Sequence, residues 1–175
     1  MGSEMCIRDR NNDTALHYAA AGGHLNIVKY FIEETAVVPA CLGWHGHTPL
    51  HDAACYKHLE LVRYLVAEQQ VDPFLQDEDG YTPLHRASQG GDIDVVCYLM
   101  NEMNEYMLKD VVYDRTKDGN TPIHYAALNG NLQVVKLFIS ELNCDPNTPD
   151  QQGSCLLYTS PSPRDATLSR MPSSA

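Results

Sequence analysis

Apolar residues recur along most of this chain in four blocks with helical spacing. In the first block they occupy positions i, i+2, i+3, i+6 and i+7 counted from Leu25, and the same spacing begins again at Leu59, Ile93 and Leu132. This spacing predicts a helix with one broad apolar face in each block. One helix pair of this size cannot bury such a face alone, so we expect neighbouring blocks to cover one another in a linear stack.

A shorter helix is predicted ahead of each apolar block. Four copies of the phrase Thr-x-Leu/Ile-His mark its start, at Thr14, Thr48, Thr82 and Thr121. Thr is a good helix N-cap, and the Pro that follows it in three copies suits the first helical position. The Thr-to-Thr spacings are 34, 34 and 39 residues, and a period in this range indicates stacked repeats.

Glycines separate the predicted elements in most copies. A turn that ends in Gly, or in Asn12 in the first copy, precedes each phrase, and Gly supplies positive φ at low cost. The break between the two helices falls at Gly23, Gly91 and Gly130, with Lys57 as the exception.

The combined pattern, turn-Gly-x-Thr-Pro-Leu-His-x-Ala-Ala followed by Gly-His-Leu-x-x-Val, resembles the ankyrin repeat over residues 11–154. The resemblance implies an all-α solenoid of helix-turn-helix units with projecting β-turn fingers. We expect repeats at about 11–43 (unit one), 44–77 (unit two), 78–116 (unit three) and 117–149 (unit four), and the start of a truncated fifth repeat at 150–154.

The two ends of the chain share no pattern with the repeats. Residues 1–10 and 155–175 can be encoded by DNA sequences that are reverse complements of each other, and both resemble translated sequencing-adapter sequence. We therefore expect both ends to be non-native and to pack poorly. A natural Ser- and Pro-rich tail is the alternative, but it does not explain the complementarity.

The 39-residue spacing adds five residues between units three and four. Met100, Met103 and Met107 share one helical face there, which predicts that the second helix of unit three continues for about one more turn. The longer helix either packs on its own unit or offers an apolar contact to a partner.

Charge and cysteine content narrow the functional classes. The net charge is −11, which opposes nucleic-acid binding and favours a protein partner with a basic surface. No apolar run reaches the length of a membrane span. Cys41, Cys55, Cys97 and Cys144 lack metal-site or disulfide-scaffold spacing, so we expect reduced thiols, an intracellular, cytoplasmic location and a monomer.

Eight histidines invite catalytic or metal-binding interpretations. His17, His51, His85 and His124 recur at one repeat position, and the ankyrin resemblance implies that they buttress the fingers. His45 and His47 with His51 resemble a metal cluster, but a tetrahedral site needs further ligands. Cys55 follows His51 by four residues without any oxyanion device. No cofactor motif occurs in the repeats, so we expect neither an enzyme nor a metal protein.

Partners of ankyrin repeats typically meet the concave side, which the finger tips and first helices form. Carried onto this chain, that surface comprises Trp44, His45, His47, Tyr56, Glu78, Asp79, Tyr81, Gln89, Lys117, Asp118, Asn120, Leu128 and Asn129. Trp44, Tyr56 and Tyr81 stand out because Trp and Tyr are enriched among interface hot spots. Trp44 either anchors a partner or folds back onto its own finger.

Two functions fit this pattern. The first is a protein–protein interaction scaffold. The second is a regulatory or substrate-docking arm of a larger enzyme, channel or ubiquitin ligase. The residues of the repeats do not discriminate between the two, because the module works alike in both.

Overall fold

The computed structural model describes residue 9 and residues 12–35, 37–102, 111–142 and 144–145. Within these ranges the chain forms four helix pairs. They are α1 (Ala15–Ala21) with α2 (Leu25–Glu34), α3 (Pro49–Cys55) with α4 (Leu59–Arg63), α5 (Pro83–Gly90) with α6 (Ile93–Asn101), and α8 (Pro122–Leu128) with α9 (Leu132–Leu142). A short π-helix, η2 (Tyr64–Glu68), extends α4, and a 3₁₀ turn, η1 (Trp44–Gly46), precedes α3.

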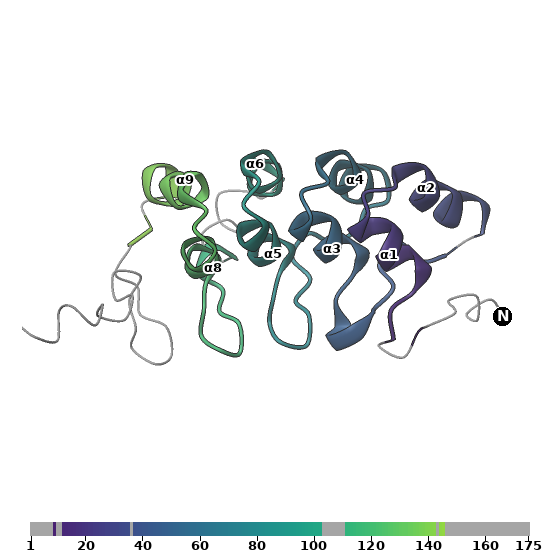
Figure 1. Cartoon of the computed structure of the whole chain (residues 1–175), viewed down its shortest axis with the longest axis horizontal. Helices are drawn as coiled ribbons and strands as arrows, with labels where there is room; N and C mark the ends of the chain where they lie inside the picture. Colours follow the sequence, from purple (N-terminus) through teal and green to yellow (C-terminus); the bar gives the residue numbers. More distant parts are fainter. Residues whose placement is uncertain (1–8, 10–11, 36, 103–110, 143, 146–175) are drawn as a thin grey trace, which may run out of the picture.

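The helices lie in two layers with the fingers on one side. Helices α1, α3, α5 and α8 form one row, and α2, α4, α6 and α9 form a second row, drawn above it in Figure 1. The loops that precede the first row project to the opposite side, downwards in the view (Figure 1). The predicted all-α stack of helix pairs is therefore confirmed. The start of a fifth repeat at 150–154 and the tail 155–175 lie outside the described residues.

The first helix of each unit starts with a reciprocal cap between Thr and His. The backbone N–H groups of Thr14, Thr48, Thr82 and Thr121 donate to the Nδ1 atom of the His three residues later, at 3.1–3.3 Å. The Thr hydroxyl lies 2.7–2.9 Å from the same nitrogen. Because Nδ1 accepts a backbone N–H, it carries no proton, and the histidine is neutral with its hydrogen on Nε2.

Small residues bring the first helices close together. Ala20, Ala53, Ala54, Ala87 and Ala126 are fully buried. At the end of α5, Gly90 approaches α3 so closely that a Cβ there would lie 2.3 Å from the backbone oxygen of Cys55. The small-residue pattern thus sets the spacing of the inner layer.

The second helices bury the predicted apolar face most completely in the middle of the stack. Leu61, Val62 and Leu65 of unit two and Val95 and Val96 of unit three are buried. At the two ends, Ile27 of α2 and Leu132 of α9 are exposed. The difference arises because an end unit has a neighbour on one side only.

The predicted breaks between the two helices of each unit have left-handed backbones. The φ angles of Gly23, Gly91 and Gly130 are 69°, 88° and 72°, and Lys57 adopts 70° at the equivalent position of unit two. A non-glycine residue in this region is strained by roughly 1–2 kcal/mol. Unit two therefore carries a local cost that the other three units avoid.

Lys57→Gly is expected to stabilise the protein by about 0.5–1 kcal/mol. Relief of the left-handed strain exceeds the extra chain entropy that glycine loses on folding. Urea unfolding measures the change. As a matched control, Lys136→Gly places glycine at an exposed site inside α9 and should destabilise by about 1 kcal/mol. Equal destabilisation by both changes would contradict the strain at Lys57.

The predicted extra turn after Met100 is only partly described. Helix α6 ends at Asn101, with Glu102 as its C-cap. Met103 and Met107 lie outside the described residues. Of the two ends expected to pack poorly, Asp9 alone is described. It is exposed, and its carboxylate accepts a hydrogen bond from the Tyr18 hydroxyl at 2.5 Å. The expectation for the two ends stays a prediction.

Candidate functional site

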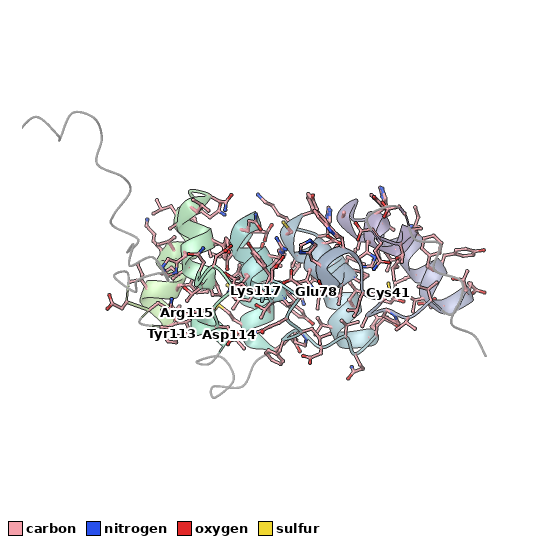
Figure 2. All side chains as sticks on the ribbon, turned by 90° about the horizontal axis from the view of Figure 1, so that it is seen from below. Cys41, Glu78, Tyr113, Asp114, Arg115 and Lys117 are labelled. Atoms are coloured by element: carbon pink, nitrogen blue, oxygen red, sulfur yellow. The ribbon has the colours of Figure 1, made fainter. Side chains whose placement is uncertain are left out.

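Backbone hydrogen bonds connect the fingers of units two, three and four. The Glu78 N–H donates to the carbonyl of His45 at 2.7 Å, and the Lys117 N–H donates to the carbonyl of Asp79 at 2.9 Å. The view onto the finger side places Glu78 and Lys117 on this surface (Figure 2). The fingers thus form a continuous row instead of independent loops.

The buried histidines add a second set of links between units. The Nε2–H groups of His17, His51 and His85 donate to the backbone carbonyls of His47, Tyr81 and Asp114, at 3.2, 3.0 and 3.2 Å. The buttressing role that the ankyrin resemblance implies is confirmed for these three. For His124 the structure shows the equivalent cap to Thr121.

Burial lowers the pKa of these histidines. Loss of solvent around the rings lowers the pKa values of His51 and His85 to about 4, and it also lowers the pKa of His17. A proton on Nδ1 would point at the N–H of the capping Thr, so the hydrogen bonds also favour the neutral ring. The hydrogen bonds and the lowered pKa values therefore indicate the same protonation state. None of the three is available as a base at neutral pH.

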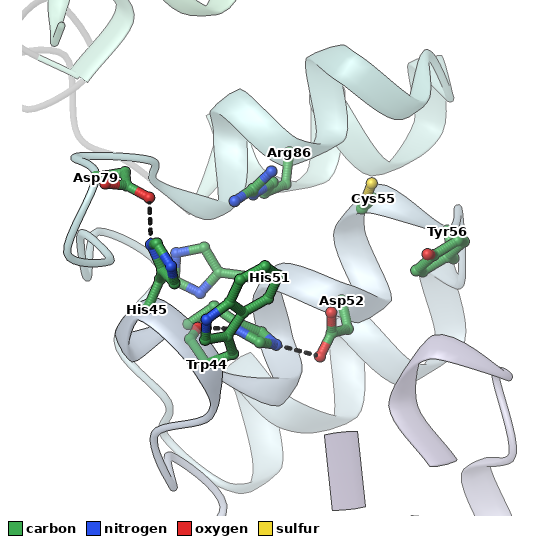
Figure 3. A pocket seen from close by; sticks show the side chains of 9 residues that line it. Trp44, His45, His51, Asp52, Cys55, Tyr56, Asp79 and Arg86 are labelled. Carbon is green, nitrogen blue, oxygen red and sulfur yellow. Dashed lines mark hydrogen bonds and ion pairs between the residues drawn. The ribbon is translucent and has the colours of Figure 1, made fainter. Parts of the chain in front are cut away.

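A pocket of about 260 Å³ opens on the finger side between units two and three. Its walls come from the finger turn of unit two, from α3, from the next finger and from α5 (Figure 3). The lining residues are Trp44, His45, His47, His51, Asp52, Cys55, Tyr56, Asp79 and Arg86. Five of these, Trp44, His45, His47, Tyr56 and Asp79, are among the residues predicted to bind a partner.

Two exposed aromatic side chains flank this pocket. Trp44 is 57% exposed and Tyr56, the C-cap of α3, is 58% exposed. The Trp44 ring meets the His45 ring edge to face, with centroids 4.6 Å apart. Trp44 therefore touches its own finger, yet more than half of its surface remains open.

The third predicted aromatic anchor, Tyr81, is only partly accessible. Its hydroxyl accepts a hydrogen bond from the Tyr125 hydroxyl at 2.9 Å, and the two ring centroids are 5.0 Å apart. The Arg86 guanidinium lies 3.8 Å from the Tyr81 ring centroid and pairs with Asp77 at 3.1 Å. These contacts give Tyr81 a structural role between units three and four.

The predicted partner surface has two neighbouring acidic residues, Glu78 and Asp79, and Asp79 is already paired. Asp79 lies 2.7 Å from Nδ1 of His45 and 3.7 Å from the Lys117 ammonium. The Glu78 side chain is exposed, and no ion pair to it occurs in the described part of the chain. Glu78 thus has more capacity than Asp79 for a basic partner.

The remaining predicted residues do not line the pocket. Gln89 and Asn120 are partly buried, whereas the exposed residues, Lys117, Asp118, Leu128 and Asn129, all belong to unit four. Among the described residues, Leu128 is the most open of the large apolar side chains at 79%. The predicted surface is therefore longer than the pocket and continues towards α8.

Sequence reasoning did not select Asp52 and Arg86. Both occupy the position directly after the repeated His, where the other units carry Tyr18 and Tyr125. That position faces the fingers, so its change from Tyr to Asp and Arg was the signal available in the sequence.

This geometry gives little support to the predicted metal cluster or to a nucleophilic site at Cys55. Among the described residues, the ligand atoms that come within 4.8 Å of one another belong to Asp13, His17 and His47, and not to the predicted set of His45, His47 and His51. Burial raises the pKa of the Cys55 thiol, and both ring nitrogens of His51 are already hydrogen bonded. A thiolate–histidine pair is thus disfavoured.

Comparison with protein families settles the class of this fold. The family model described as ankyrin repeats (3 copies) matches residues 1–75 and again residues 67–150. The chain belongs to the ankyrin-repeat family. No curated protein matches it significantly. Ankyrin repeats are generally protein-interaction modules, and the family is typically a non-catalytic scaffold. Over the described residues, no helix combines the length and apolar character needed to cross a membrane.

Proposed function

We propose that this ankyrin-repeat region binds a partner protein on its finger side, centred on the pocket between units two and three. The observation that carries the proposal is the pair of exposed aromatic side chains, Trp44 and Tyr56, at a pocket of about 260 Å³. Exposed Trp and Tyr beside a concave site are the features of an interface anchor. The fingers and first helices that hold them are tied together by the links described above.

The partner that fits this surface carries a basic region next to an apolar anchor. The net charge of −11 attracts basic segments over a distance. Near the pocket, however, Asp79 and Asp77 are already paired with Lys117 and Arg86. Buried area at Trp44 and Tyr56 therefore supplies affinity, while the acidic field raises the association rate. We also propose that the protein is a monomer and that it is located inside the cell, in the cytoplasm.

The alternative keeps the same site in a different setting. The repeats would act as a regulatory or substrate-docking arm of a larger enzyme, channel or ubiquitin ligase. Extending the reading frame on both sides of residues 11–154 in the source transcript distinguishes the two settings, because only the second requires a neighbouring catalytic or channel domain.

Trp44→Ala is expected to weaken partner binding by about 2 kcal/mol or more, roughly thirtyfold. A randomised peptide library displayed on phage, selected against the full chain, supplies the binding peptide, and calorimetry measures its affinity for each variant. The free energy of unfolding should change by less than about 0.5 kcal/mol, because the side chain is mostly exposed.

Tyr30→Ala is the matched control, since Tyr30 is 59% exposed but lies on α2 in the outer layer. It should leave the affinity unchanged. If Trp44→Ala loses stability but binds the peptide normally, Trp44 stabilises its own finger, and the proposal that it contacts the partner is wrong.

A further inference from the structure

His47 has a bonding environment that no other unit reproduces. The equivalent residues in units one, three and four are Asp13, Tyr81 and Asn120. Both ring nitrogens of His47 face oxygen atoms. Nδ1 donates to the backbone carbonyl of Trp44, and Nε2 lies 3.2 Å from the Asp52 carboxylate and 3.6 Å from the Asp13 carboxylate.

This arrangement fixes the protonation state of the ring. A carbonyl oxygen only accepts hydrogen bonds, so Nδ1 must carry a hydrogen. A carboxylate likewise only accepts, so Nε2 attracts the two carboxylates only when it carries a hydrogen as well. An imidazole with hydrogens on both nitrogens is a cation.

The charges around His47 fit this state. Asp13 from the finger of unit one and Asp52 from α3 face it, and the neighbouring rings of His17 and His51 are neutral. Burial alone would lower the pKa of His47, but the contacts with Asp52, the Trp44 carbonyl and Asp13 outweigh it and raise the pKa to about 9.

The same groups hold the backbone of Trp44 on both sides. The Trp44 N–H donates to Oδ1 of Asp13 at 2.8 Å, while its carbonyl accepts from Nδ1 of His47. Nε2 of His47 in turn lies 3.6 Å from Oδ1 of Asp13. Trp44 is thus clamped within a network that reaches from unit one to α3.

We propose that His47 is an imidazolium at neutral pH that connects Asp13 and Asp52 and positions Trp44 for partner binding. His47 is then a positioning residue of the pocket and does not serve as an independent contact at a finger tip. The binding part of this proposal rests on the proposed function, whereas the charge state does not.

Trp44 is the single Trp of the chain, so its fluorescence reports on this network directly. In the full chain we expect Trp44 emission to change with a midpoint near pH 9, where His47 loses its proton. The titration is performed in a His45→Gln background, because the His45 ring also contacts Trp44. Adding His47→Gln should remove the transition.

The result of the titration decides whether the His47 ring is charged at neutral pH. A His47-dependent transition near pH 6.5 would show an ordinary neutral histidine and overturn the proposal, as would no His47-dependent transition at all. A rise in melting temperature with one equivalent of Zn²⁺ that requires Asp13, His17 and His47 would show a metal site instead and would overturn it equally.

Two variants test the positioning role with the selected peptide. His47→Gln should weaken binding about three- to tenfold, as expected for the loss of charge-assisted hydrogen bonds. His47→Arg, which retains positive charge and several N–H donors, should restore most of the affinity. Equal losses in both variants would overturn the positioning role. If Trp44→Ala leaves peptide binding intact, the proposed function fails while the fluorescence titration still decides the charge state.

Discussion

Lowering the pH from 6.5 to about 4 is expected to remove roughly 5 kcal/mol from the free energy of unfolding. His51 and His85 have pKa values of about 4 in the folded protein, against 6.5 in the unfolded chain. Each shift corresponds to about 3 kcal/mol. Since domains of this size are stable by only about 5–15 kcal/mol, the protein should unfold cooperatively in mild acid.

The direction follows from proton linkage. Between pH 4 and 6.5 the unfolded state binds more protons than the folded state, so stability falls as the pH falls. Above pH 6.5 the contribution of these two histidines is complete. His47 behaves oppositely, because its raised pKa adds stability that is complete below pH 6.5 and is lost as the pH rises through 9.

Urea unfolding at a series of pH values measures this dependence. The slope of the unfolding free energy against pH gives the number of protons that the chain takes up on unfolding. His51→Gln should lower this number by about one, whereas His24→Gln, at an exposed site, should leave it unchanged. Stability that stays constant from pH 6.5 to 4.5 would refute the neutral, buried state of these histidines.

Gly90→Ala is expected to destabilise the protein by about 3 kcal/mol. Alanine normally favours a helix over glycine by about 1 kcal/mol, and Gly90 has no positive φ that would forbid it. The new Cβ would nevertheless lie 2.3 Å from the Cys55 oxygen and 3.1 Å from its carbon. Both are backbone atoms, so no rotamer change relieves the clash and α3 and α5 must separate.

Gly22→Ala provides the matched control at the equivalent position of unit one. Its Cβ would approach the His24 ring at 2.7 Å, but this side chain is exposed and can rotate away. The control should change stability by less than about 1 kcal/mol in thermal or urea unfolding. If Gly90→Ala stabilises the protein, helix propensity outweighs the contact between α3 and α5.

Local sequence rules account for the elements of this fold. The N-cap role of Thr82 was predicted from the sequence, and so were the helix breaks at Gly91 and Gly130. The reciprocal bond from the Thr82 backbone to the His85 ring was not predicted. The π-helical segment Tyr64–Glu68 was not predicted. Its apolar residues Leu65 and Val66 fit an ordinary helix equally well, and nothing in their spacing indicates a change of hydrogen-bond pattern.

The site was less predictable because its contacts join distant residues. Tyr81 follows a turn glycine, which suggested an exposed tip, yet it packs against Tyr125, 44 residues later. His47 follows another turn glycine and carries the same suggestion. The carboxylates that raise its pKa are Asp52, five residues later on α3, and Asp13 in the preceding unit. Spacing within one repeat gives no information on the contact with Asp13.

Burial along the second helices determines where the stack opens locally. Leu61 and Val95 in the second helices of units two and three are buried, whereas Ile27 at the same position of unit one is exposed. Opening of backbone hydrogen bonds therefore costs least at the ends and most in the middle. The Trp44 pocket lies between units two and three, so the helices that line it open last. The hydrogen bond from the Trp44 N–H to Asp13 is the contact that depends on the finger of unit one.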